Sequence, residues 1–394
     1  MKRAQLIISA GKEKALLRRH PWVFSGAVKR VVGNPEEGDL VDVCLPDGRW
    51  AAVGHYQNDS IVCKVLSFDT PEVDAAFFRA RLLSAIQYRE RLGFFDREDT
   101  NAFRLIHAEG DAMPGLVCDW YNGVLVMQAR SVGMHRLFPM LTQLFAQLLE
   151  RHGLRSVFDK SGATVPGGAE NRYLWGEEPA EWEIKEHGLR LLINFFEGQK
   201  TGFFLDQREN RKLVESLARG RRVLNCFGYT GGFSLAALSG EAGYVETVDI
   251  SKRAIELCNR NVELNFADPS RHCGVVADVL KYLDTVAATF DLIILDPPAF
   301  AKNHRSLQQG LKGYRSINQR AMEKIAPGGL LMTFSCSQAV SVDDFKTMCF
   351  TAAANARRQV RIVRQLPHAM DHPVSIFHPE GEYLKGLLLE VEPQ

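Results

Sequence analysis

One short segment limits the folds open to this chain more than any other. The apolar run Val223–Phe227 leads into the turn Gly228-Tyr229-Thr230-Gly231-Gly232, and a helical pattern, Phe233–Leu238, follows at once. A buried strand, a glycine turn and a helix in this order let the backbone approach a ligand closely, with helix N–H groups facing it. The segment therefore predicts a nucleotide-type site at the end of a parallel strand.

The next two predicted strands end in acids. Asp249 ends the apolar segment that begins at Tyr244, and its place after the glycine turn suits an acid that accepts hydrogen bonds from ribose hydroxyls. Asp278 follows a third apolar segment. Each acid alone is more often a turn residue or a helix cap, but a glycine turn and two acids at three successive strand ends indicate one site. The predicted cofactor-binding residues are Phe227, Gly228, Gly231, Asp249, Ile250 and Asp278.

The glycine pattern also limits the cofactor. It is not the G-x-G-x-x-G of dinucleotide-binding proteins, and the chain holds no G-x-x-x-x-G-K-[ST] motif that would grip phosphates. Acids for a ribose and a base, with little for a pyrophosphate, suit an adenosyl cofactor such as S-adenosylmethionine. A hydride-transfer enzyme that binds NAD is weakened by the same pattern but stays open.

A second pair of strand ends carries the predicted chemistry. The buried strand Phe290–Leu295 ends in Asp296-Pro297-Pro298, and the next strand, Leu330–Ser335, ends at Cys336. Consecutive strands in such a unit are commonly neighbours, about 5 Å apart, so we expect Asp296 and Cys336 side by side at the carboxyl edge. A free cysteine is usually a small buried hydrophobe, but this position makes Cys336 a candidate nucleophile with Asp296 as its acid partner.

A thiol beside a carboxylic acid suits one methyl transfer well. The C5 carbon of cytosine is a poor nucleophile, so its direct methylation is slow. Addition of a thiolate at C6, with an acid hydrogen-bonded to N3, makes C5 resemble an enamine that can attack a sulfonium methyl group. A base then removes the C5 proton, and elimination frees the cysteine.

The chain is long enough for more than one domain. Residues 1–73 read as short strands separated by turns, which predicts a small β-barrel. Eight lysines and arginines against one acid in the first 30 residues could attract phosphate backbones, although a solvated face explains them equally well. Residues 74–184 read as α+β, with a helix over 73–93, a hairpin at Asn122-Gly123 and a helix over 134–152.

Residues 185–394 alternate strands and helices to the end of the chain. This pattern predicts a parallel sheet covered on both faces. Within it, Asp206 and Glu209 have the spacing of a capping box before a helix over Gln207–Ala218. The fold class is therefore α/β, with a barrel and an α+β domain preceding the parallel sheet.

At these residues the chain resembles the class I methyltransferases and, more closely, the bacterial 23S rRNA cytosine-5 methyltransferase family, which joins a PUA domain to such a catalytic domain. The resemblance rests on Asn225–Gly232, Asp296–Phe300, Ser335-Cys336-Ser337 and His20–Phe24. It implies a class I Rossmann-like methyltransferase domain preceded by a PUA-like β-barrel and an α+β linking domain. It also implies that S-adenosylmethionine is the cofactor, ribosomal RNA the partner, Cys336 the nucleophile and Asp296 the contact to cytosine.

Two alternatives in function stay open. Amino-group methyltransferases acting on purines commonly place an aromatic residue directly after the two prolines, to stack on the base. Here Ala299 occupies that place, with Phe300 one residue later, so this alternative is weaker. RNA cytosine-5 methyltransferases often carry a second cysteine at the same place, thought to help product release, so another base must serve here. A catalytically silent RNA-binding protein is the second alternative.

Composition excludes other classes. The eight cysteines contain no Cys-x-x-Cys pair, so neither a disulfide framework nor a metal site is expected. No apolar run approaches the ~18 residues that suggest a membrane span. We therefore expect a cytoplasmic protein that binds no membrane, and the sequence leaves a homodimer open.

Overall fold

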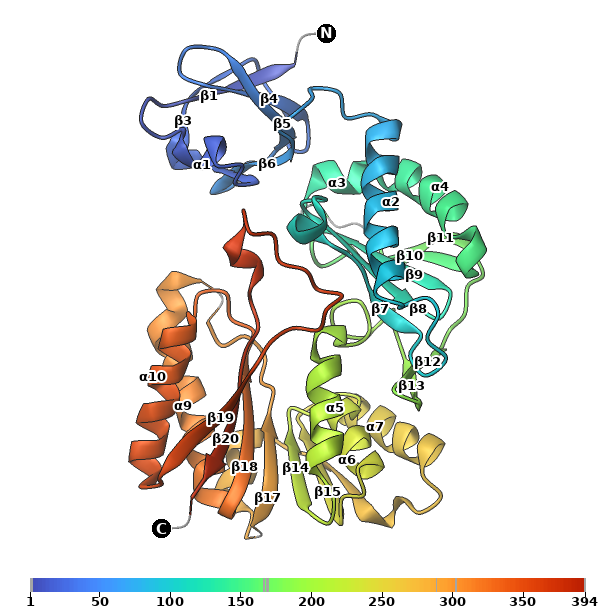
Figure 1. Cartoon of the computed structure of the whole chain (residues 1–394), viewed down its shortest axis with the longest axis vertical. Coiled ribbons are helices and arrows are strands. Elements are labelled where there is room, and N and C mark those ends of the chain that lie inside the picture. Colours follow the sequence, from blue (N-terminus) through green and yellow to red (C-terminus); the bar gives the residue numbers. More distant parts are fainter. Residues whose placement is uncertain (1–2, 166, 168–169, 288, 302, 393–394) are drawn as a thin grey trace. The chain divides into compact units, whose positions relative to one another are not determined.

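The computed structural model describes residues 3–165, 167, 170–287, 289–301 and 303–392, and the chain divides into two compact units (Figure 1). The first unit comprises Met1–Ile184, Ile193–Leu205 and Met370–Gly381. The second comprises Lys185–Leu192, Asp206–Ala369 and Glu382–Gln394. The boundaries drawn from sequence at residues 73/74 and 184/185 remain predictions.

The first unit begins with a six-stranded sheet in the order β2-β6-β5-β4-β1-β3, curled around its own apolar core. Val41, Val43 and Ala52 are fully buried in that core, because alternate residues of neighbouring strands point to the same face. The short strands separated by turns that the sequence predicts here are confirmed. The elements are β1 (Ala4–Ile8), α1 (Lys14–Leu17), β2 (Trp22–Phe24), β3 (Val28–Val32), β4 (Leu40–Cys44), β5 (Trp50–Tyr56) and β6 (Ile61–Ser67).

A five-stranded sheet in the order β11-β10-β9-β8-β7 follows, with helices packed on it. The hairpin at Asn122-Gly123 is confirmed, since both residues have the positive φ, 49° and 92°, that a tight turn of this kind requires. The elements are α2 (Ala75–Arg91), β7 (Ala102–His107), β8 (Leu116–Tyr121), β9 (Val124–Ala129), α3 (Val132–Arg136), α4 (Phe138–Leu148), β10 (Ser156–Asp159) and β11 (Arg172–Gly176).

The single helix predicted over 134–152 is wrong. The chain forms α3 and α4 as separate helices, and a 3₁₀ turn follows over Glu150–His152. Pro139 lies in the first turn of α4. A proline lacks the N–H that would continue the preceding helix and its ring clashes with the carbonyl four residues earlier, so α3 ends before it.

The arginines of two buried ion pairs, on α2 and β7, bind the segment Met370–Gly381. The guanidinium of Arg89, fully buried, donates to Asp111 at 2.5 and 2.9 Å and to the carbonyl of Asp371 at 2.7 Å. Arg104 donates through its side chain to Asp119 at 2.5 Å, and its backbone N–H donates to the Asp371 carboxylate at 2.7 Å. A segment far along the sequence is thus held in the first unit by charged groups removed from water.

Asp111→Ala is expected to destabilise the protein by roughly 3–5 kcal/mol, because it leaves the Arg89 cation buried without its carboxylate. Urea unfolding followed by tryptophan fluorescence measures the change. Asp284→Ala is the matched control: Asp284 pairs with Arg320 at the surface, where such a pair is worth about 0–1 kcal/mol. Equal losses for the two variants would contradict the importance of the buried pair.

The second unit is built on a seven-stranded sheet in the order β16-β15-β14-β17-β18-β20-β19 (Figure 1). Five neighbouring strands are parallel, as the alternation predicts. β20 is antiparallel to both of its neighbours, which corrects the expectation of a parallel sheet throughout. The strands are β14 (Arg222–Cys226), β15 (Tyr244–Asp249), β16 (His272–Val276), β17 (Phe290–Leu295), β18 (Ile325–Ser335), β19 (Val360–Leu366) and β20 (Lys385–Val391), and β12 (Trp182–Glu186) and β13 (Leu189–Ile193) form a separate pair.

The reason for the reversal is the connection before β20. A parallel neighbour needs a crossover, usually a helix, that returns the chain to the start of the sheet. Between β19 and β20 the described chain has only a 3₁₀ turn over Pro379–Gly381, so β20 runs back beside β19 in the opposite direction. The helices of this unit are α5 (Arg208–Leu217), α6 (Gly232–Ser239), α7 (Lys252–Asn265), α8 (Val279–Thr285), α9 (Leu307–Lys324) and α10 (Val342–Ala356).

The predicted capping box before α5 is wrong. A 3₁₀ turn over Leu205–Gln207 precedes the helix, so Gln207 and not Asp206 takes the N-cap position, and its side chain makes no cap. The Asp206 carboxylate accepts a hydrogen bond from the Tyr383 hydroxyl at 2.6 Å. Among the described residues, no helix is long and apolar enough to cross a membrane.

Candidate active site

The strand order of the large sheet reverses between β14 and β17. From β14 the chain proceeds outward through β15 and β16, and it then returns to the other side of β14 as β17 and β18. Ligands of open parallel sheets bind outside the carboxyl ends of the strands at such a reversal. Cys226 is opposite Leu295 in the register, so the glycine turn after β14 and Asp296 after β17 begin at the same level of the sheet.

The glycine turn has the conformation that its sequence predicts. A Cβ atom on Gly228 would lie 2.3 Å from the Thr247 side chain, so only glycine fits there. Phe227 and Tyr229, with φ of 59° and 46°, also adopt left-handed conformations, each at a cost of order 1–3 kcal/mol. The Tyr229 N–H donates to the Asp249 carboxylate at 3.0 Å, which fixes the turn to the next strand end.

A series of hydrogen-bonded polar side chains connects β14, α6, β15 and β16 next to the turn. Ser234 on α6 accepts from the Asn225 amide at 2.8 Å and lies 2.6 Å from the Thr247 hydroxyl, which lies 2.8 Å from the His272 ring. Burial lowers the pKa of His272 to about 4, so the ring is neutral at pH 7. This series of hydrogen bonds was not predicted from the sequence. Its signal is the serine, threonine and histidine within otherwise apolar elements.

The residues after β15 fit the adenosine part of an adenosyl cofactor. The Asp249 carboxylate accepts from the backbone N–H groups of Ser251 at 2.8 Å and Tyr229 at 3.0 Å. Since a carboxylate offers about four lone-pair sites, it can accept ribose hydroxyls as well. Ile250 beside it is 73% exposed, an apolar surface suited to a purine ring.

Asp278 is a helix cap in this structure. Its carboxylate accepts the N–H of Lys281 at 3.0 Å and begins α8. Asp278 thus has the role that an isolated acid before a helix usually has, that of a cap. The lone pairs that the cap does not use could also accept an adenine amino group. Phe227, Gly228, Gly231, Asp249, Ile250 and Asp278 all belong to the second unit, at or after the carboxyl ends of β14, β15 and β16.

Cys336 lies beside Pro297, the residue that follows Asp296, and direct contact between Asp296 and Cys336 stays a prediction. β17 and β18 are parallel neighbours, with Leu295 opposite Thr333. The Cys336 sulfur lies 3.9 Å from the Pro297 carbonyl oxygen, and both Cys336 and Asp296 are half-buried. Burial raises the pKa of the Cys258 and Cys349 thiols to about 12, so those thiols are uncharged at neutral pH. Cys336 differs from them in its place, because it directly follows β18 at the carboxyl edge of the sheet.

Lys385 is a candidate functional residue that was not predicted from the sequence. It lies opposite Ser335 at the start of β20 and is 6% exposed. Its ammonium group donates to the carbonyl oxygens of Ser337 at 2.6 Å and Tyr383 at 2.7 Å. Burial lowers the pKa of Lys385 to about 8, and attraction to a Cys336 thiolate opposes that fall. The signal in the sequence is one lysine before the apolar run Gly386–Leu389.

Lys385→Met is expected to slow alkylation of Cys336 by iodoacetamide about tenfold at pH 7, because the nearby cation favours the thiolate. Lys385 carries its charge below its pKa of about 8 and loses it as the pH rises through that value. The difference between variant and wild type should therefore be largest below pH 8 and disappear above it.

Mass spectrometry of the Cys336 peptide measures this rate, with the exposed Cys273 as an internal reference. Lys312→Met, at an exposed position of α9, is the matched control. A difference that stays constant from pH 6 to pH 10 would contradict an effect of the Lys385 charge.

Tyr314 and Ser337 fix the loops that follow β17 and β18. The Tyr314 hydroxyl lies 2.8 Å from the Ser337 hydroxyl, which accepts the backbone N–H of Ala301 at 3.1 Å. The Phe300 ring packs on the Tyr314 ring, with centroids 4.7 Å apart. The loop after Asp296-Pro297-Pro298 is thus joined to the loop after Cys336 by hydrogen bonds between buried groups.

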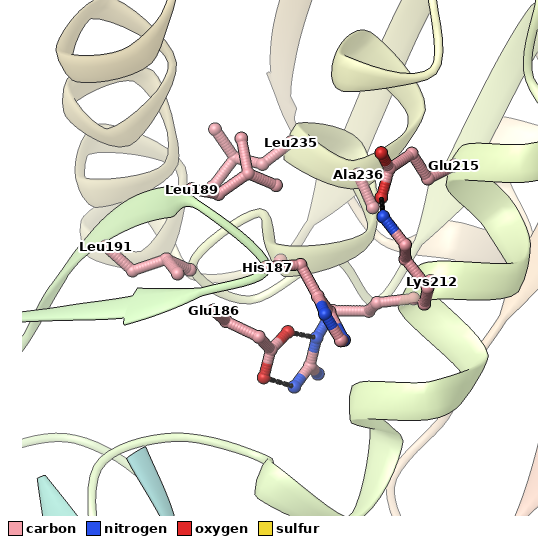
Figure 2. Close-up of a pocket in the computed structure, with 10 residues that line it drawn as sticks. Glu186, His187, Leu189, Leu191, Lys212, Glu215, Leu235 and Ala236 are labelled. Atoms are coloured by element: carbon pink, nitrogen blue, oxygen red, sulfur yellow. Dashed lines mark hydrogen bonds and ion pairs between the residues drawn. The ribbon is translucent and has the colours of Figure 1, made fainter. Parts of the chain in front are cut away.

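A small cavity in the same unit has a structural role. It lies between the hairpin β12–β13 and helices α5 and α6, and its volume of about 10 Å³ holds roughly one water molecule (Figure 2). Glu186 accepts two hydrogen bonds from the Arg211 guanidinium there, at 2.5 and 2.7 Å. Burial raises the pKa of Glu186, but the nearby guanidinium groups outweigh this and keep it below its usual value.

Comparison with known proteins places these observations in a context. Residues 103–374 match the profile of the S-adenosylmethionine-dependent methyltransferases, and residues 6–68 match that of the PUA-like domain. The chain is 40% identical to ribosomal RNA large subunit methyltransferase I of Erwinia tasmaniensis, over 98% of this chain and 99% of that protein. It is 41% identical to the protein of the same name from Aeromonas salmonicida, over 96% and 97% of the two chains.

Solved structures share the fold. A SAM-dependent methyltransferase structure from Streptococcus mutans superposes with a TM-score of 0.87 at 22% identity, covering 99% of this chain and 100% of the other. A methyltransferase structure complexed with SAH superposes with a TM-score of 0.88 at 23% identity and the same coverage. At such identities the likeness concerns the fold.

Proposed function

Because the chain belongs to the S-adenosylmethionine-dependent methyltransferases and, among them, to the family of the ribosomal RNA large subunit methyltransferase I proteins, we propose that it methylates the C5 carbon of cytosine in 23S ribosomal RNA. One observation carries the choice of C5: the Cys336 thiol lies beside the Asp296-Pro297 segment at the carboxyl edge of the sheet, and that segment follows β17, the neighbour of the strand that leads into the glycine turn. The mechanism follows from that pair.

The RNA substrate has two supports. The relatives are named for methylation of large-subunit ribosomal RNA. The PUA-like domain carries Arg18, Lys29 and Arg30 at exposed positions, where they can neutralise phosphates. The proposed chemistry takes every group from one chain, so it gives no support to the homodimer that the sequence leaves open.

S-adenosylmethionine supplies an electrophilic methyl group on a sulfonium. The turn at Gly228 and Gly231 would let the backbone approach the cofactor, and the Asp249 carboxylate would accept its ribose hydroxyls. Ile250 would cover one face of the adenine, and Asp278 would accept its amino group. Phe227, in its left-handed conformation, directs the chain from β14 into the turn.

Cys336 begins the reaction. Its thiolate forms a bond to C6 of cytosine, while Asp296 gives a proton to N3 or holds one there, so that electron density moves to C5. The Lys385 ammonium stabilises the thiolate before the attack. C5 then takes the methyl group from the sulfonium, which becomes a neutral thioether. A base removes the C5 proton, N3 returns its proton to Asp296, and the bond between the Cys336 sulfur and C6 breaks. The target base must be unpaired or flipped out of its helix to reach this edge.

The rival amino-group reaction needs an aromatic platform after the prolines. Ala299 is too small to serve, and Phe300 packs on Tyr314 with centroids 4.7 Å apart. A silent RNA-binding protein would need no nucleophile and no cofactor site, yet this chain has the glycine turn, the acid and the thiol at neighbouring strand ends. Cytosine methylation uses all three.

Product analysis tests the proposal. The protein is incubated with labelled S-adenosylmethionine and unmodified 23S ribosomal RNA, which is then digested to nucleosides and examined by mass spectrometry. We expect 5-methylcytidine as the labelled product. A labelled methyladenosine or methylguanosine would overturn the choice of C5, and an absence of labelled RNA would favour the silent protein.

A further inference from the structure

We propose that the first unit holds a pocket for an unpaired nucleotide of the RNA substrate, between helix α4 and the edge strand β11. The inference rests on the proposed function, because the ligand is taken to be part of that RNA. The cavity has a volume of about 520 Å³, within the roughly 300–1,000 Å³ of small-ligand sites. The residues that line it include Arg136, Thr142, Asp159, Arg172, Leu174 and Trp175.

A β-bulge gives the pocket its aromatic wall. β11 pairs with β10 so that Val157 is opposite Trp175 and Phe158 is opposite Tyr173, which leaves Leu174 as the extra residue. A bulge changes the alternation of side chains, so Leu174 and Trp175 both line the cavity. Trp175 is 42% exposed, although a large aromatic residue is usually covered. An exposed indole on an edge strand is a surface on which a base can stack.

The charges around the pocket favour an anion. Arg172 is exposed, and within the described part of the chain its guanidinium has no carboxylate partner. Arg136 pairs with Asp39 at 3.0 Å, but both side chains are largely in water, where such a pair is worth little. The acid of the pocket, Asp159, is occupied by His135 at 2.7 Å. The pocket therefore has two arginines against one acid, whose oxygens already accept hydrogen bonds from His135 and from the Ser161 N–H.

A buried hydroxyl points to a ligand independently of the charges. Thr142 on α4 is 6% exposed, and among the described residues its hydroxyl has no hydrogen-bond partner. A buried polar group without a partner costs about 1–3 kcal/mol, so such groups are rare unless something else satisfies them. Thr142 lines the cavity, and a base edge placed there would supply the missing partner.

These features together identify the class of ligand. An aromatic face, arginines for phosphate and a hydroxyl for a base edge are what proteins use to hold a single-stranded nucleotide. Bases within a helix are stacked on their neighbours and could not enter. The pocket would therefore take a nucleotide from a loop or an opened helix, at a site other than the thiol and acid of the second unit.

Steady-state methylation of 23S ribosomal RNA by Trp175→Ala and Arg172→Ala tests the pocket. Each variant is expected to raise KM for the RNA about tenfold and to leave kcat and the Kd for S-adenosylmethionine unchanged, because Trp175→Ala removes the stacking surface and Arg172→Ala removes a phosphate contact. Thr142→Val keeps the shape of the side chain and should raise KM a few-fold. Arg79→Ala, an exposed arginine of α2 outside the cavity, is the matched control.

The failure of the pocket and the failure of the proposed function give different results. Active variants with an unchanged KM would overturn the pocket and leave cytosine methylation standing. If the wild-type protein makes no 5-methylcytidine, the pocket is tested by tryptophan fluorescence: a short single-stranded RNA should quench wild type more strongly than Trp175→Phe, and equal quenching overturns the pocket. Competition by free cytidine monophosphate at the same concentration as the RNA strand would overturn RNA as the occupant.

Discussion

Cys336→Ala is expected to lower methyl transfer to ribosomal RNA by at least about 10³-fold while leaving S-adenosylmethionine binding unchanged. The loss is large because C5 of cytosine is not nucleophilic until the sulfur has added to C6, so the variant lacks a step that no other group supplies. Single-turnover rates with saturating RNA measure the chemical step, and equilibrium dialysis with labelled cofactor measures binding.

Cys273→Ala is the matched control for this variant. Cys273 is the exposed cysteine of the described chain, and its loss should leave the rate within twofold of wild type. Activity of Cys336→Ala within tenfold of wild type would contradict covalent catalysis. It would instead favour transfer to an amino group, which needs no thiol.

Asp296→Asn is expected to lower the rate about 10²–10⁴-fold, again without a change in cofactor affinity. Asparagine has nearly the same shape and can still donate a hydrogen bond to N3, but it cannot transfer a proton to that nitrogen, which is the larger part of acid assistance. Single-turnover rates with saturating RNA measure the loss of the chemical step, and equilibrium dialysis with labelled cofactor measures binding.

Asp291→Asn is the control for Asp296→Asn because it lies on the same strand, at the opposite end. Its carboxylate accepts the backbone N–H of Arg222 at 2.8 Å, a contact that an asparagine oxygen can replace. A variant at Asp296 that retains half of the wild-type rate would show that the acid positions the substrate and does not move a proton.

The parts of the site that could be predicted depend on local sequence. The turn after β14 needs glycine because Thr247 leaves no room for a Cβ at Gly228, and that requirement is visible in the sequence. Asp296 and Cys336 could be placed together because successive strands of a parallel sheet tend to be neighbours, and β17 and β18 follow that tendency.

The parts that could not be predicted depend on contacts between distant segments. Lys385 contacts the loop after Cys336 only because β20 pairs with β18 in the antiparallel direction. The alternation of strands and helices in the sequence does not predict that direction. The segment Met370–Gly381 belongs to the first unit because Asp371 contacts Arg89 and Arg104, which lie 282 and 267 residues earlier.

Competing local interactions explain the two predicted elements that are wrong, the capping box before α5 and the single helix over 134–152. Asp206 has the spacing of a capping residue, yet its carboxylate accepts from the Tyr383 hydroxyl, and a 3₁₀ turn shifts the start of α5. The periodicity over 134–152 is helical throughout, but the proline at 139 ends α3 and begins α4. That break brings the end of α3 and the start of α4 to the cavity that holds Thr142.

Trapping of the covalent intermediate is the most direct test of the attack of Cys336 on cytosine. RNA that contains 5-fluorocytidine can undergo thiol addition and methyl transfer, but fluorine cannot leave C5 as a proton does, so the enzyme should remain attached. We predict a complex that survives denaturation, requires S-adenosylmethionine, and yields on digestion a nucleotide linked to the peptide containing Cys336. A complex linked through another residue, or efficient methylation of ordinary RNA with no trapped complex, would contradict the attack of Cys336 on cytosine C6.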